Sequence, residues 1–285
     1  MNRKFFVTSL FLTLMFVSYI SCDMSMKQKS NFKVQVDRFA DIEILRYQVP
    51  GFDNLSLRQK KFVYFLSQAS LSGRDIIYDQ NYRYNLIIRR TIHNIIKNYN
   101  GDKKLDSWKQ FVNYAKRVWF SNGIHHHYST MKIIPAFEES YFEDLIYNSE
   151  GEFPLNPGES LEQFILRIIP IIFNPEIDSK RVNLDPDDDI ISSSANNYYN
   201  AVSQDEVEKF YLEMKDPNDP TPIWYGLNSR LTKEKGKIFE KIWKLNGLYG
   251  SAIKEIIYWL EQAKDVAEND AQKEELEILI DYYRT

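Results

Sequence analysis

Three adjacent histidines, His125, His126 and His127, are the side chains of this sequence best suited to proton transfer or metal binding near neutral pH. Alternate side chains of an extended backbone share a face, so His125 and His127 would point together and His126 away. Two imidazoles make at most half of a tetrahedral zinc site, and a third ligand would have to come from elsewhere. The triplet leaves three interpretations open: a metal site, a substrate-lining cleft surface, or solvated and packing residues.

The other candidate residues favour structural roles. His93 lies among isoleucines in a helical pattern, so we expect it to be structural. Asp185 and the aspartates at 187–189 resemble a calcium-binding loop, but Ile190 and Asn196 stand where such a loop needs Gly and Glu. We therefore predict a solvated acidic loop. The sequence contains no H-E-x-x-H, no glycine-rich dinucleotide or P-loop motif and no G-x-S-x-G, so those reaction classes lack their usual support.

Cys22 is the single cysteine, and it ends a segment typical of export signals. Arg3 and Lys4 precede an apolar run at 5–20, which is shorter than the roughly 18–20 residues that span a bilayer. We predict a signal peptide over residues 1–22, with Cys22 where a lipoprotein is cleaved and acylated; plain secretion and an uncleaved anchor are the alternatives. A polar tether is expected at 23–31. The predicted protein is exported to the cell envelope and held on a membrane by its lipid.

Composition predicts a folded protein with an uneven distribution of charge. Hydrophobic residues make up 44% and charged residues 27%, close to globular averages, and the net charge is −4. Residues 58–117 hold 13 Lys and Arg against 4 Asp, whereas residues 185–219 hold 10 acids against 2 Lys. Two solvated faces would explain this pattern. The alternatives are a basic surface for nucleic acid or acidic lipid and an acidic wall for cationic ligands, and we expect no nucleic-acid partner.

Helices must position most of these residues. The isoleucine-rich stripe from Tyr84 to Tyr99 predicts a helix, and the segment from Trp108 to Trp119 carries a matching stripe. Pro170 should limit or kink the helix that begins near residue 160. Other helices are predicted at 57–72, 138–148, 203–215, 238–245, 249–263 and from 269 onward, with capping boxes at Ser160–Gln163 and Ser203–Glu206.

Strands are predicted to be few and short. Alternation indicates one or two strands between residues 32 and 47, and residues 223–227 suggest another. Periodicity fails at 121–130, which predicts a loop, and residues 174–200 are the most loop-like segment and a candidate hinge. The expected fold class is α+β and mainly helical.

Specific strings carry a resemblance to a known family. These are YFLSQA at 64–69, GRDIIYDQ at 73–80 and VWFSNGIHHHYS at 118–129, followed in the same order by YGLNS at 225–229 and YWL at 258–260. They are similar to the amino-terminal (upper) lobe of the dipeptidyl-peptidase III family of zinc metallopeptidases, most closely to its Bacteroidetes branch. The resemblance extends from about Phe39 to Thr285.

The resemblance implies a two-lobed hydrolase that releases dipeptides from the free amino terminus of short peptides. It implies zinc held by an H-E-x-x-G-H helix and an E-E-x-R-x-D helix, and neither motif occurs in these 285 residues. No catalytic or metal-binding residue can therefore be assigned, and we expect this chain itself to bind no zinc. The loop at 121–130 would face the cleft, with Tyr128 offering a ring to the peptide and Asn122 and His126 within reach of its backbone.

We therefore interpret residues 32–285 as the amino-terminal, cleft-forming lobe of a dipeptidyl-peptidase, truncated and inactive alone because the zinc lobe is absent. The alternative is a free-standing peptide-binding or scaffold lipoprotein without catalysis. A third hypothesis is a basic-surface binder whose affinity falls steeply as salt rises. Short peptides are the expected partners in the first two cases, and the sequence does not determine an oligomeric state.

Overall fold

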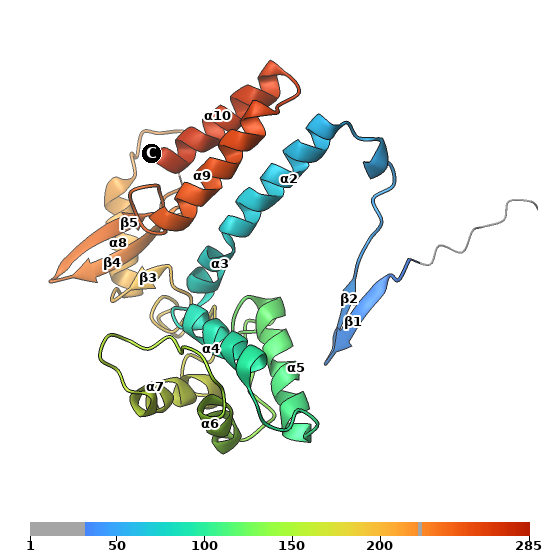
Figure 1. Ribbon diagram of the computed structural model, residues 1–285. Helices are drawn as coiled ribbons and strands as arrows, with labels where there is room; N and C mark the ends of the chain where they lie inside the picture. Colours follow the sequence, from blue (N-terminus) through green and yellow to red (C-terminus); the bar gives the residue numbers. More distant parts are fainter. Residues whose placement is uncertain (1–31, 222–223) are drawn as a thin grey trace, which may run out of the picture. The chain divides into compact units, whose positions relative to one another are not determined.

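A computed structural model describes residues 32–221 and 224–285 (Figure 1). The predicted signal peptide, the tether and Cys22 lie outside these residues. The described residues fall into two compact units, which are separated between Pro50 and Gly51. In the first unit, β1 (Gln35–Phe39) and β2 (Ile42–Leu45) form an antiparallel hairpin, which confirms the strands expected between residues 32 and 47. Ala40 makes the turn with a φ of 48°.

The second unit is mainly helical with one small sheet, as the sequence predicted. A short 3-10 helix, η1 (Phe52–Asn54), comes first, and β3 (Tyr199–Asn200), β4 (Ser229–Glu234) and β5 (Lys237–Ile242) form the sheet. The helices are α2 (Leu57–Ser72), α3 (Arg74–Asn81), α4 (Asn85–Asn98), α5 (Asp106–Ser121), α6 (Glu139–Tyr147), α7 (Leu161–Phe173), α8 (Gln204–Met214), α9 (Gly250–Asp265) and α10 (Asp270–Arg284). Among the described residues, no helix is long and apolar enough to cross a membrane.

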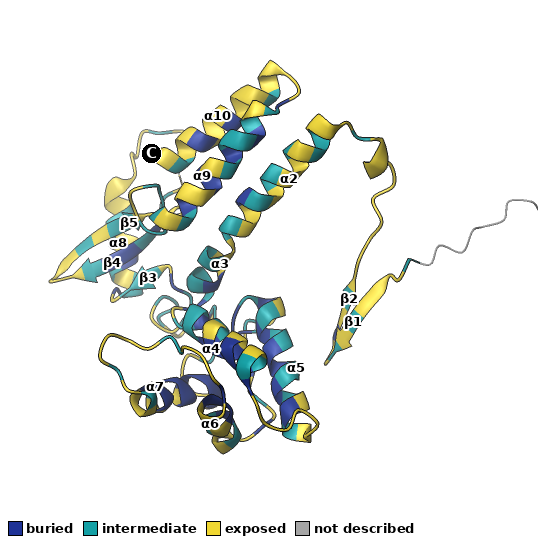
Figure 2. Cartoon of the chain, viewed as in Figure 1, coloured by how far each residue is buried: buried dark blue, intermediate teal, exposed yellow. Residues whose placement is uncertain are grey.

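Helices α4 to α7 enclose the largest hydrophobic core. The isoleucine stripe of α4 meets the matching stripe of α5, as expected from their periodicity, and α6 and α7 close the other sides. Buried residues accumulate along α5 and α7 in Figure 2. Fully buried members include Ile88, Ile92, Ile95, Phe111, Val118, Phe142, Phe164 and Ile172.

A second core joins helices that lie far apart in the sequence. Helix α2 packs along α9, and α10 packs on α9 as well. Ala69 from α2, Ile253 and Leu260 from α9, and Ile280 from α10 are buried there. Ser56 caps α2 through a reciprocal capping box with Gln59, so the start of this helix is fixed locally.

The sheet corrects one helix predicted from the sequence. Residues 237–242 are strand β5, which pairs antiparallel with β4, whereas a helical face had been expected at 238–245. Lys235 and Gly236 form the turn with φ values of 50° and 78°, which suits a two-residue hairpin. Ile238 and Ile242 are four positions apart, and residues at this interval lie on one face of either a helix or a strand. The turn at Lys235 and Gly236 selects the strand.

Helix α7 extends through Pro170 and ends three residues after it. The helix continues through Pro170 to Phe173, and the amide of Asn174 still bonds the Pro170 carbonyl at 3.1 Å. Proline removes the hydrogen bond to the carbonyl of Leu166, four residues earlier. Leu166 is 76% exposed, so this side of α7 faces solvent. Both predicted capping boxes, at Ser160 with Gln163 and at Ser203 with Glu206, are confirmed.

Candidate functional site

The loop at 121–130 begins with a sharp turn at the end of α5. Asn122 caps the helix in the left-handed conformation, with a φ of 52°, and its amide bonds the carbonyls of Val118 and Trp119. Asparagine is among the residues that adopt this conformation most readily. Gly123 follows with a φ of +146°, and a Cβ built there would lie 2.0 Å from Nδ2 of Asn85. Only glycine fits at this position without displacing Asn85.

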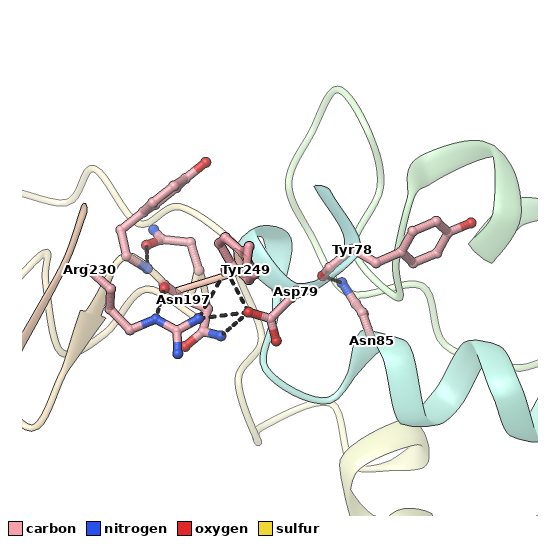
Figure 3. A network of polar contacts seen from close by, with 8 residues as sticks. Tyr78, Asp79, Asn85, Asn197, Arg230 and Tyr249 are labelled. Carbon is pink, nitrogen blue, oxygen red and sulfur yellow. Dashed lines mark hydrogen bonds and ion pairs between the residues drawn. The ribbon is translucent and has the colours of Figure 1, made fainter. Parts of the chain in front are cut away.

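Asn85 holds the start of this loop against α3 and α4. Its side chain is fully buried, and its Nδ2 donates to the carbonyls of Tyr78 at 3.1 Å and Asn122 at 3.3 Å. Its Oδ1 accepts the amide of Ile124 at 3.1 Å. Figure 3 shows Asn85 bonded to the Tyr78 carbonyl. The whole amide is satisfied by backbone groups, so its role is to fix the course of the loop.

His125 is an interior residue of the loop. Its side chain is 2% exposed, its Nε2 lies 2.7 Å from the Asp178 carbonyl, and its ring packs edge-on against Tyr82. Burial lowers the pKa of His125 to about 4. The imidazole is therefore neutral at pH 7 and donates from Nε2, while its Nδ1 is buried with no hydrogen-bond partner among the described residues.

A tight turn closes the loop around His126. The His126 amide bonds the Met131 carbonyl at 2.8 Å, and the Thr130 amide returns to the His126 carbonyl at 3.1 Å. The Nδ1 atom of His126 accepts the amides of Tyr128 and Ser129 at 3.2 and 3.1 Å. An imidazole that accepts at Nδ1 carries its proton on Nε2, so this side chain retains a donor for a ligand.

The tip of the loop presents an aromatic ring. Tyr128 is 88% exposed. His127 packs its ring against Phe120, with centroids 4.8 Å apart, and against the His126 ring at 4.4 Å. The expected pairing of His125 with His127 on one face is therefore wrong, because the turn buries His125 and places the rings of His126 and His127 together.

The three predicted site residues lie in two different parts of the same loop. His126 and Tyr128 lie in the closed turn, whereas Asn122 lies at the base, where its carbonyl accepts from Asn81 and Asn85. A substrate role for the three residues stays a prediction.

The segment at 174–200, expected to be a hinge, anchors the loop from the other side. The Lys132 amide bonds the Ser179 carbonyl and the Arg181 amide bonds the Thr130 carbonyl, each at 2.8 Å. Lys132 is 9% exposed, and its Nζ donates to the carbonyls of Ile171, Asn174 and Ile177 at the end of α7. The loop is thus fixed by buried polar groups on both sides.

A polar cluster that the sequence did not predict joins α3 to the sheet (Figure 3). The Oδ2 atom of Asp79 accepts from Nη2 of Arg230 at 2.7 Å, from the Tyr249 hydroxyl at 2.6 Å and from Nδ2 of Asn197 at 3.2 Å. Arg230 also donates from Nε to the Asn197 carbonyl at 2.7 Å. Burial and the bond to Asp79 raise the pKa of Tyr249, so it remains a protonated donor at physiological pH. No local signal in the sequence pairs residues so far apart.

Metal ligands are not grouped in the part of the chain that the structure describes. Across residues 32–221 and 224–285, no three His, Cys, Asp or Glu side chains come together in a way that could hold an ion. In the acidic segment, Asp189 instead accepts the backbone amides of Ile191, Ser192 and Gln204. The amides of Gln204 and Ser192 lower the pKa of this carboxyl group.

Comparisons with known proteins find similarity among solved structures but not among sequences. No protein-family model matches the sequence, and no curated protein sequence matches it either. Among solved structures, the chain is similar to DPP III from Caldithrix abyssi, with a TM-score of 0.48 and 14% sequence identity. The alignment covers 81% of this chain and 32% of that chain, so this chain spans about a third of the length of that protein.

Proposed function

We propose that residues 51–285 bind short peptides with free amino termini, as the amino-terminal, cleft-forming lobe of a dipeptidyl-peptidase III-like protein. The observation that carries the proposal is the construction of the loop at 121–130. Its base is fixed by Asn85, His125 and Lys132, while Tyr128 projects from it with 88% of its surface exposed. The strings at 73–80 and 118–129, which resemble that family, supply the lobe and the loop.

An exposed ring on a rigid loop is suited to peptide recognition. The ring loses little conformational freedom on binding, because the loop is already ordered and tyrosine has only two side-chain torsions. Covering most of an apolar or aromatic side chain contributes about 2–3 kcal/mol. The Nε2–H donor of His126, one turn away, can bond a peptide carbonyl and fix the peptide's direction.

Peptide binding, rather than hydrolysis, is the activity proposed for these residues. The family's zinc motifs are not in this sequence, and no zinc-dependent step is assigned to any residue here. The same binding function serves both the enzyme-lobe interpretation and the alternative of a free-standing peptide-binding lipoprotein. A longer reading frame that encodes H-E-x-x-G-H would favour the first, and its absence would favour the second.

Titration calorimetry with unblocked tetrapeptides tests the proposal. Tyr128→Ala should weaken binding by at least about tenfold, which corresponds to roughly half of the expected contribution of the ring. Tyr47→Ala is the matched control, because Tyr47 is 80% exposed but lies in the first unit. The proposal is refuted if the wild-type protein binds no tetrapeptide, or if the two alanine variants bind equally well.

A further inference from the structure

A groove beside α4 collects an excess of positive charge. It has a volume of about 1020 Å³ and is lined by α3, by one face of α4, by Trp119 at the end of α5 and by residues 151–154. The cationic side chains that line it are Arg74, Arg89, Arg90 and Lys97, and the only acid among the lining residues is Glu152. The positive balance of the segment 58–117 is thus concentrated, in part, on one concave surface.

Only some of the cationic side chains in this groove pair with other residues of the protein. Arg89 pairs with Asp75 at 2.5 Å and lies over the Tyr78 ring, so it is held in place. Arg90, His93 and Lys97 are exposed and make no hydrogen bond or ion pair with any described residue. They stand three and four positions apart on α4, and this spacing places them on one face of the helix. His93, expected to be structural, therefore lies on the solvent face of α4.

A buried donor without a partner lies at the base of the same groove. The Asn94 side chain is 8% exposed, and its Oδ1 accepts from Nδ2 of Asn98 at 2.7 Å. Its own Nδ2 has no acceptor among the described residues. Gly151 covers this amide pair so closely that a Cβ there would lie 2.5 Å from Oδ1 of Asn94. A buried amide donor without an acceptor costs about 1–3 kcal/mol, which a bound acceptor would recover.

These observations point to one ligand chemistry. Arginine and lysine side chains around a concave surface concentrate anions, and guanidinium groups bond phosphate oxygens in pairs. The Asn94 amide requires an acceptor oxygen. The four lining cations exceed Glu152 and Asp75, the acid that pairs with Arg74 and Arg89, by two, and this excess favours a group with more than one negative charge. The Trp119 and Phe153 rings form an apolar part of the groove wall, against which the remainder of a small ligand can pack. The volume of the groove lies at the upper end of the range for small-molecule pockets.

We propose that the α4 groove binds the phosphate group of a small phosphorylated compound, with the phosphate between Arg90 and Lys97. The Asn94 amide, covered by Gly151 in this structure, opens to donate from Nδ2 to one phosphate oxygen. A confined groove, rather than an extended basic stripe, favours a small ligand over nucleic acid. The site does not depend on the peptide-binding loop, so the two proposals can fail separately.

Pyrophosphate and phosphoserine, titrated into the wild-type protein at low ionic strength, test this site. We expect binding that Arg90→Gln with Lys97→Gln weakens by at least about tenfold, since bonds between charged groups are the strong ones. The matched control is Lys209→Gln with Lys273→Gln, which removes the same charge from exposed positions on α8 and α10. Equal losses in the two double variants would overturn the proposal, because they would indicate diffuse attraction.

Asn94→Asp separates a built site from a basic surface. The aspartate keeps an acceptor for Asn98 but replaces the free donor with a second acceptor, so phosphate should be repelled and binding abolished while circular dichroism stays native. Unchanged binding by a folded Asn94→Asp protein would overturn the site. The site would also be overturned if neither pyrophosphate nor phosphoserine binds. Binding only to vesicles that contain phosphatidic acid would mean that the cations contact a lipid surface instead.

Discussion

Acid should destabilise this protein through His125. The pKa of this residue falls from an ordinary value of 6.5 to about 4 because the imidazole is buried, with Lys132 and Arg181 adding smaller effects in the same direction. The Asp178 carbonyl acts in the opposite direction by accepting the Nε2–H. A histidine that must be neutral in the fold stabilises it above the pKa of the unfolded chain, and that contribution is lost as the pH falls from 6.5 toward 4.

The size of the effect follows from the width of this window. A shift of 2.5 units at 1.36 kcal/mol per unit gives about 3 kcal/mol in total, of which about 2 kcal/mol is lost between pH 7 and pH 5. The side chain is 2% exposed, so solvent screening does not reduce this figure appreciably. The unpartnered Nδ1 is where the second proton would have to be placed, and no acceptor among the described residues is there to receive it.

Urea unfolding of the wild-type protein and of His125→Gln, at pH 7 and at pH 5, measures the effect. Glutamine carries an N–H that can bond the Asp178 carbonyl but does not titrate. The variant will lose packing at both pH values, so the informative quantity is the change in the difference between the two proteins. We expect the wild type to lose about 2 kcal/mol more than the variant on going to pH 5. A constant difference across this range would refute the reasoning.

Two further substitutions test how the loop is anchored. Lys132→Met keeps the length of the side chain but leaves the carbonyls at the end of α7 unsatisfied, and it should lower the free energy of unfolding by about 2–3 kcal/mol in urea titrations, whereas exposed Lys273→Met should be nearly neutral. Gly123→Ala should reduce stability by more than about 2 kcal/mol, because the new methyl group meets Asn85. Gly158→Ala, at a φ of +79° with open space around it, carries only the backbone strain of about 1 kcal/mol. Equal melting temperatures for the two alanine variants would contradict the proposed close contact.

The sequence predicted the helices well because their signals are local. The stripe on α4, the matching stripe on α5 and the capping boxes at Ser160 and Ser203 each depend on residues within about two turns. The hairpin β4–β5 was not predicted because it depends on the backbone conformation of Lys235 and Gly236. The four-residue interval between two apolar side chains does not reveal that conformation. Strand pairing also depends on a partner elsewhere in the chain.

The position of the candidate site in the sequence was predictable, but the contacts that fix its backbone were not. The loop at 121–130 was recognisable from lost periodicity and from its resemblance to a family, and the exposure of Tyr128 agrees with a surface position. Nothing local indicated that Asn85 would bond its backbone or that His125 would turn inward. Helical spacing alone places Arg90, His93 and Lys97 on one face of α4, but the groove beside that face also needs residues 151–154, which come from a distant part of the chain.

The Asp79 cluster has a consequence for the order of events during synthesis. The side chains that bond this carboxylate are made 118, 151 and 170 residues after it. At roughly 5–20 residues per second, the carboxylate waits on the order of 10–30 s for its last partner. The core of α4 to α7 depends on contacts of shorter range and can form within that interval. Arg230 and then Tyr249 are synthesised last, so docking of the sheet onto α3 is a late step in the maturation of the nascent protein.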